Sequence, residues 1–114
     1  MKLALLLLPA TLMAQAVPDA PYFEPNKIRA LIVTGRNNHD WRTTTPFLRR
    51  ILEVTGRFDV RVTEEPMSMG AESLQPYDVL IVNYCGPRWS PATEKAVEDF
   101  VRQGKGLVAI HAAS

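Results

Sequence analysis

The stretch KIRALIVTGRNNHDW, residues 27–41, decides the fold of this 114-residue chain. It contains an apolar run from Ile28 to Val33 that is rich in β-branched residues and is followed closely by Gly35. A short run of this kind predicts a strand buried on both faces, as in a parallel sheet. A polar loop that contains His39 comes next, and open α/β sheets bind ligands just beyond the carboxyl ends of their strands. We therefore expect the strand at the centre of a sheet and the loop at one wall of a site.

Four strands are predicted in all. Three are nearly continuous apolar runs, whereas the run FDVRVTE alternates apolar and polar side chains, which favours a strand at a sheet edge. The predicted strands are residues 28–34, 58–64, 78–84 and 106–110.

Two long helices are predicted between these strands. Thr45 before Pro46 and Ser90 before Pro91 each combine a capping residue with a proline suited to the first helical turn. A short helical turn is also expected near residues 71–74, within a loop. The apolar stripes of the helices are Phe47, Leu48, Ile51 and Leu52 in the first and Ala96, Val97, Phe100 and Val101 in the second.

This alternation predicts an α/β fold with a parallel sheet and helical crossovers. The most economical arrangement is a flavodoxin-like doubly wound sheet in strand order 2-1-3-4, whose loops 35–41 and 83–89 face each other at the switch point. The last strand would then be an uncovered apolar edge, which invites aggregation. We therefore expect these residues to be the N-terminal portion of a larger domain.

The N-terminus resembles an export signal. Lys2, a short apolar segment and small residues around Gln15 predict a signal peptide of residues 1–16, cleaved after Ala16, and hence a secreted or periplasmic protein. A proline-rich linker is expected at residues 17–26, before a domain at residues 27–114. Of the 13 Lys and Arg residues only Lys2 lies in the signal, and none of the 12 Asp and Glu residues does. The mature chain is thus nearly neutral, which gives no reason to expect a nucleic-acid partner.

The only two histidines, His39 and His111, both follow predicted strands. With one strand between theirs, the strand ends lie about 10 Å apart. A metal ion held by both rings would therefore require the loop 35–41 to fold over. His111 also stands where a nucleophile elbow would place Ser or Cys, before the small residues 112–114, so that acid/base or ligand-binding roles are expected.

Other polar and aromatic residues near these strand ends are candidates for substrate binding. Each also has a structural alternative, because acids cap helices, tryptophans pack and asparagines close turns. The single cysteine, Cys85, has no neighbouring base and is expected to be a plain buried thiol. The candidates for substrate binding are Gly35, Asp40, Trp41, Asn83, Tyr84 and Trp89.

The segments LIVTGRNNHDW, YDVLIVNY and VEDFVRQGKGLVAIHAAS resemble the ThuA-like (trehalose-utilisation) domain of the class I glutamine-amidotransferase-like superfamily. The resemblance implies a flavodoxin-like sheet, a role in sugar metabolism and a small carbohydrate as partner. It also implies that His111 occupies the position of the catalytic cysteine in true amidotransferases, so that glutamine hydrolysis is not expected.

Three interpretations remain open. The first is an exported carbohydrate-active enzyme in which His39 and His111 are the catalytic pair. The second is a non-catalytic sugar-binding or interaction module of a larger secreted protein. The third is a site for a divalent metal ion that uses both histidines, together with Asp40 or groups outside these residues.

Overall fold

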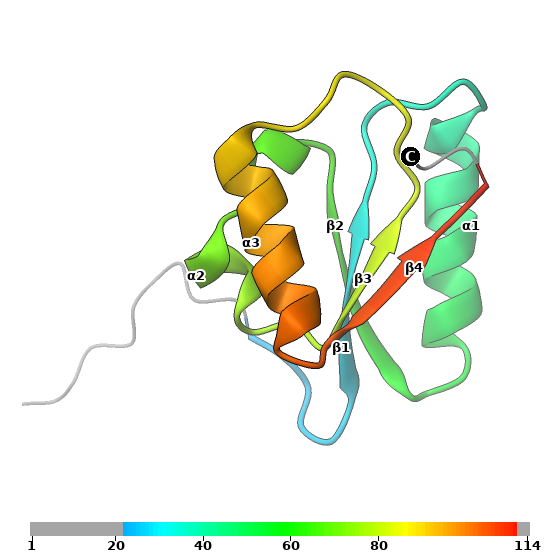
Figure 1. Ribbon diagram of the computed structural model, residues 1–114. Coiled ribbons are helices and arrows are strands. Elements are labelled where there is room, and N and C mark those ends of the chain that lie inside the picture. The colour runs from blue at the N-terminus through cyan, green and yellow to red at the C-terminus, as the bar shows by residue number, and fades with distance from the viewer. Residues whose placement is uncertain (1–21, 112–114) are drawn as a thin grey trace, which may run out of the picture.

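The computed structural model describes residues 22–111, which form one four-stranded parallel sheet covered by helices on both faces (Figure 1). The spatial order of the strands is β2-β1-β3-β4, as the sequence predicted. The predicted signal peptide and the first half of the linker, residues 17–21, lie outside the described residues. The elements are β1 (Ile28–Val33), α1 (Trp41–Glu53), β2 (Phe58–Thr63), a 3-10 turn (Pro66–Ser68), α2 (Ala71–Leu74), β3 (Val79–Val82), α3 (Pro91–Arg102) and β4 (Gly106–Ala109).

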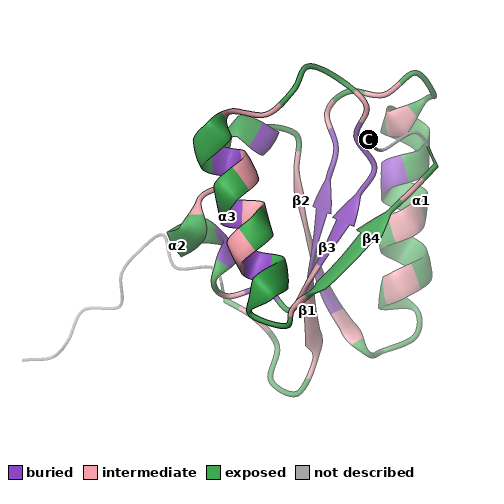
Figure 2. Ribbon diagram, viewed as in Figure 1, coloured by how far each residue is buried: buried purple, intermediate pink, exposed green. Residues whose placement is uncertain are grey.

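The central strands are buried on both faces because their side chains alternate between two apolar clusters. Leu31 and Val33 face α2 and α3 together with Leu80 and Phe100, whereas Ile32 faces α1. Figure 2 shows β1 and β3 as the buried middle of the sheet and β4 as an exposed strand. The parallel register places the carboxyl ends of all four strands at one rim of the sheet.

The first helix begins earlier than predicted. Asp40, not Thr45, is the N-cap, and its carboxylate accepts a hydrogen bond from the backbone N–H of Thr43. Pro46 therefore lies inside α1, where it lacks the N–H that would bond to the carbonyl of Arg42. The cap at Asp40, more than one turn upstream, sets the start of the helix in place of the preference of Pro46 for a first turn.

The predicted apolar stripes are only partly buried. On α1, Leu48 and Leu52 pack against the sheet, but Phe47 and Ile51 are 62% and 46% exposed. On α3 the same stripe includes Val101, which is 42% exposed. Four apolar residues per stripe span a wider arc of the helix than the sheet covers within residues 22–111.

The end of the predicted linker is anchored on the domain. Residues 22–26 have no regular structure, but the backbone N–H of Glu24 donates to the carboxylate of Asp59, and Phe23 packs edge-on against Tyr77. Arg61 pairs with Asp59 at 2.6 Å, so this buried carboxylate on β2 is neutralised as well as hydrogen-bonded. Within the described residues, no helix is both long and apolar enough to cross a membrane.

Candidate functional site

The two histidines meet at the rim formed by the strand ends. Nε2 of His39 lies 3.1 Å from Nδ1 of His111, although 72 positions separate them in the chain. The ring planes are tilted by 46° and the ring centroids are 5.0 Å apart, so the rings touch through their nitrogens and are not stacked. The separation of the strand ends argued against this contact. The loop between β1 and α1 is held against the end of β3, where Asn37 bonds to Asn83 and the backbone of Arg36 bonds to that of Cys85.

His111, which follows β4, has a left-handed backbone conformation. Its φ of +48° is rare for residues other than Gly, Asn and Asp, and such a conformation costs about 1–3 kcal/mol. The elbow predicted at His111 stays a prediction, because residues 112–114 lie outside the described part of the chain. The strained backbone carries the imidazole into contact with His39.

Two asparagines hold the loop that carries His39. The side-chain carbonyl of Asn37 accepts the backbone N–H of His39 at 3.1 Å, and its amide donates to Asn83 at 3.3 Å. Asn83 is 5% exposed and follows β3, so the loop that carries His39 is fastened to the centre of the sheet. The predicted role of Asn83 in binding substrate remains a prediction, whereas its role in holding the loop is visible.

The network continues into the core through hydroxyl groups that sequence reasoning missed. The amide of Asn83 donates to the hydroxyls of Thr44 and Thr45, both at 3.2 Å, and Thr45 also bonds to Thr34 at 2.9 Å. Thr34 and Thr45 are 0% and 5% exposed. The signal available in the sequence was a run of three threonines, TTT, beside an Asn-Asn pair, and it predicts hydroxyl partners only once the topology is known.

Asp40 is occupied as a helix cap. Besides the backbone of Thr43, its carboxylate accepts the hydroxyl of Thr43 at 2.7 Å. These two hydrogen bonds from Thr43 are the main causes that lower the pKa of Asp40. Its carboxylate therefore faces the first turn of α1, and helix capping accounts for its contacts.

The backbone conformation at position 35 requires a glycine. Its φ is +105°, and a Cβ atom at this position would lie 2.1 Å from the carbonyl oxygen of Glu64. Only a residue without a side chain fits at position 35, where the chain leaves β1 close to the end of β2. This close approach starts the loop that leads to His39.

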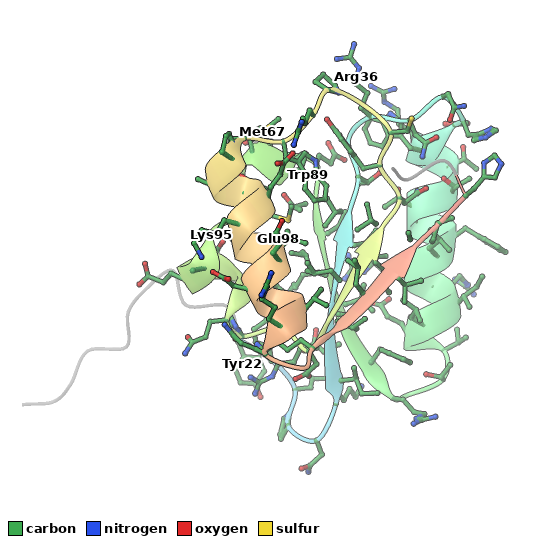
Figure 3. The ribbon with its side chains drawn as sticks, in the orientation of Figure 1. Tyr22, Arg36, Met67, Trp89, Lys95 and Glu98 are labelled. Carbon is green, nitrogen blue, oxygen red and sulfur yellow. The ribbon has the colours of Figure 1, made fainter. Side chains whose placement is uncertain are left out.

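Tyr84 and Trp89 lie on the other face of the sheet. Because side chains alternate along a strand, Asn83 points toward α1 and Tyr84 toward α3, where its hydroxyl donates to the carbonyl of Pro87. Figure 3 shows Trp89 beside the N-terminal end of α3, and its ring centroid lies 5.9 Å from that of Tyr84. The predicted substrate-binding residues are thus divided between two faces.

A cavity of about 240 Å³ lies beside Tyr84 and Trp89, between α3 and β4. Its walls are mostly apolar, and an ion pair between Arg88 and Glu94, at 2.6 Å, lies at its edge. The indole Nε1 of Trp89 is buried without a hydrogen-bond partner. The cavity is separate from the histidine pair, because none of its lining residues belongs to the loop before α1.

The two loops at the switch point, which were predicted to face each other, are also joined through their backbones. The backbone N–H of Cys85 donates to the carbonyl of Arg36 at 2.8 Å, while the Arg36 side chain points outward from the rim (Figure 3). Trp41 begins α1, and the guanidinium of Arg42 covers its ring at 4.4 Å. Within residues 22–111, no three His, Cys, Asp or Glu side chains gather as a metal-binding group.

These features define a class of protein. The domain is a flavodoxin-like α/β domain with a histidine pair and an asparagine–threonine network at the topological switch point. The chain belongs to the ThuA family, described as trehalose utilisation, whose family model matches residues 29–114. The comparison with curated proteins gives no significant match.

Two solved structures are similar. A ThuA-like protein from Parabacteroides merdae shares 34% sequence identity and a TM-score of 0.67, over 76% of this chain and 33% of that protein. A ThuA-like protein from Bacteroides uniformis shares 24% identity and a TM-score of 0.64, over 83% of this chain and 40% of that protein, and supports the fold. The chain thus spans one third to two fifths of the length of these relatives.

Proposed function

We propose that the protein acts in carbohydrate metabolism, on trehalose or a related glycoside, and that His39 and His111 form the acid/base pair of its site. The single observation that carries the proposal is the 3.1 Å contact between the two ring nitrogens at the rim of the sheet. The only two histidines of the 114 residues meet at the place where this fold binds ligands.

The pair is suited to moving a proton. A hydrogen bond between two imidazole nitrogens requires one ring to donate its N–H and the other to present a lone pair. In a neutral pair, the outer nitrogens, Nδ1 of His39 and Nε2 of His111, then carry one lone pair and one N–H between them, so a sugar hydroxyl placed against them would meet an acceptor or a donor, as general acid/base catalysis requires. Both histidines are exposed, so their rings are accessible to a small polar ligand.

Residues around the pair supply the other requirements of a sugar site. Asn37 and Asn83 hold the loop, and the half-buried Trp41 lies two residues from His39, where an aromatic ring is able to stack on a sugar face. The family description, trehalose utilisation, agrees with a carbohydrate as the small-molecule partner. Export to the periplasm or medium, with cleavage after Ala16, is proposed from the N-terminal sequence alone.

The test is turnover of trehalose and related glucosides by the full-length protein and by two variants, His39→Gln and His111→Asn. Asparagine tolerates the left-handed backbone at position 111, so the second change removes the imidazole and keeps the turn. We expect each variant to lose about 10²-fold or more in turnover, the usual contribution of a general acid or base.

The matched control is Asn38→Ala, which changes an exposed residue of the same loop and should leave turnover intact. Unchanged turnover in both histidine variants would exclude the pair from the mechanism. Saccharide binding without any turnover by the unaltered protein would instead support the alternative of a non-catalytic sugar-binding module.

A further inference from the structure

We propose that His39 and His111 together bind one divalent transition-metal ion, with the remaining coordination positions open to water or to adjacent hydroxyls of a polyol. The inference rests on the site of the proposed function but replaces a free acid/base pair by a metal chelate. It is carried by the placement of two imidazole nitrogens, Nε2 of one ring and Nδ1 of the other, against each other.

The distance between these nitrogens suits a shared ion. A tetrahedral Zn²⁺ with Zn–N bonds of about 2.05 Å holds two ligand nitrogens about 3.3 Å apart, and a right-angle pair at about 2.1 Å holds them about 3.0 Å apart. The observed separation of 3.1 Å lies between these values. The ion would lie roughly 1.3 Å to one side of the line that joins the nitrogens.

The arrangement of the rings permits this geometry with small rotations. Their planes are tilted by 46° and both side chains are exposed, so neither ring is locked by packing around it. The backbones are less free. The N–H of His39 is held by Asn37, and His111 lies in a left-handed turn, so the two chain segments remain at chelating distance.

The number of ligands indicates the kind of site. No third His, Cys, Asp or Glu side chain joins the pair within residues 22–111, and the neighbouring Asp40 already caps α1. A site with two protein ligands leaves coordination positions open, which distinguishes it from closed structural zinc sites with four. Imidazole ligands favour Zn²⁺, Ni²⁺ and Cu²⁺ over Ca²⁺ and Mg²⁺, which prefer oxygen.

The experiment measures metal binding directly. Full-length protein freed of metal with a chelator is titrated with Zn²⁺ by calorimetry, and its Cu²⁺ complex is analysed by pulsed electron paramagnetic resonance, which counts coordinated imidazoles. We expect one ion with two imidazoles in the unaltered protein. His39→Gln and His111→Asn should each weaken the affinity by about tenfold or more, since even outer contacts of metal ligands contribute that much.

Chelation also predicts non-additivity, because a single remaining imidazole binds weakly. The double variant should therefore be little weaker than either single variant. Asp40→Asn, which keeps a capping side chain, and Cys85→Ser are the controls and should bind Zn²⁺ as the unaltered protein does. Zn²⁺ affinity that is unchanged in both histidine variants, or that is lost in Cys85→Ser, would overturn the proposal.

The same preparations separate this inference from the proposed function. Histidine-dependent Zn²⁺ binding without saccharide turnover would support the metal site and contradict the sugar assignment. Histidine-dependent turnover that survives complete removal of metal, in a protein that shows no histidine-dependent Zn²⁺ binding, would support the proposed function and overturn the metal site.

Discussion

Asn83 and Thr45 are joined by a hydrogen bond of 3.2 Å that links the end of β3 to the second turn of α1. Both residues are 5% exposed, so the bond lies in the interior. Through Asn37 the same amide side chain supports the loop of His39. The position of the candidate site therefore depends on a buried polar network.

Replacing Asn83 by alanine should destabilise the domain by about 1–3 kcal/mol, because Asn37 loses its buried partner and Thr45 keeps only Thr34. Urea unfolding of the full-length protein measures this difference. Asn38→Ala, on the exposed side of the loop, is the matched control and should cost at most about 0.5 kcal/mol. Equal effects of the two changes would show that the network contributes nothing to stability.

Gly35→Ala should cost about 3 kcal/mol or more, because it adds a clash with the backbone of Glu64 to an unfavourable left-handed conformation. Gly56→Ala isolates the second effect, since Gly56 has a φ of +70° and no atom within 4 Å of the added Cβ, and it should cost only about 1–2 kcal/mol. Thermal unfolding compares the two variants. A Gly35 variant no less stable than the Gly56 variant would show that the loop relaxes freely.

The ion pair between Arg88 and Glu94 should make stability depend on pH. Hydrogen bonding to Arg88 lowers the pKa of Glu94 below its ordinary value of 4.5. The stabilisation is therefore fully present above the pKa of the unfolded state and is lost as the pH falls through the lower pKa of the folded state.

Glu94→Gln supplies the measurement. The difference in unfolding free energy between the unaltered protein and this variant should be largest near neutral pH and should shrink toward zero in acid. It should also be small and decrease with added salt, because the Arg88 side chain is 86% exposed. A difference that is the same at pH 7 and pH 3 would contradict the assigned pKa shift.

Saccharide binding should respond to Trp41 and not to Trp89. Trp41→Ala removes an aromatic ring two residues from His39 and should weaken binding by up to about tenfold, since a stacked aromatic contributes about 0.5–1.5 kcal/mol. Trp89→Phe keeps an aromatic ring in the apolar cluster near α3, on the other face of the sheet, and should leave binding unchanged. Isothermal titration with trehalose distinguishes them, and the reverse order of effects would move the sugar site to the cavity beside Trp89.

Much of the fold was predictable because β-branched apolar runs have few alternatives. The three runs with nearly continuous apolar sequence became β1, β3 and β4, and the alternating run became the edge strand β2. The start of α1 was not predictable from proline preference, because Asp40 and Thr43 form a cap that competes with it locally. The exposure of Phe47 and Ile51 was also not predicted, because an apolar stripe on a helix does not indicate how much of the stripe the rest of the domain covers.

The sequence by itself determined a parallel α/β sheet, the strand order and the presence of both histidines at strand ends, because hydrophobic periodicity and short crossovers leave few other topologies. Only the tertiary structure decided that His39 and His111 touch, that Asn37 and Asn83 hold the loop of His39, and that Tyr84 and Trp89 face the other way. The physical reason is that burial is encoded locally by side-chain type, whereas a contact across 72 positions depends on how one loop folds over a neighbouring strand and on a left-handed turn at its partner.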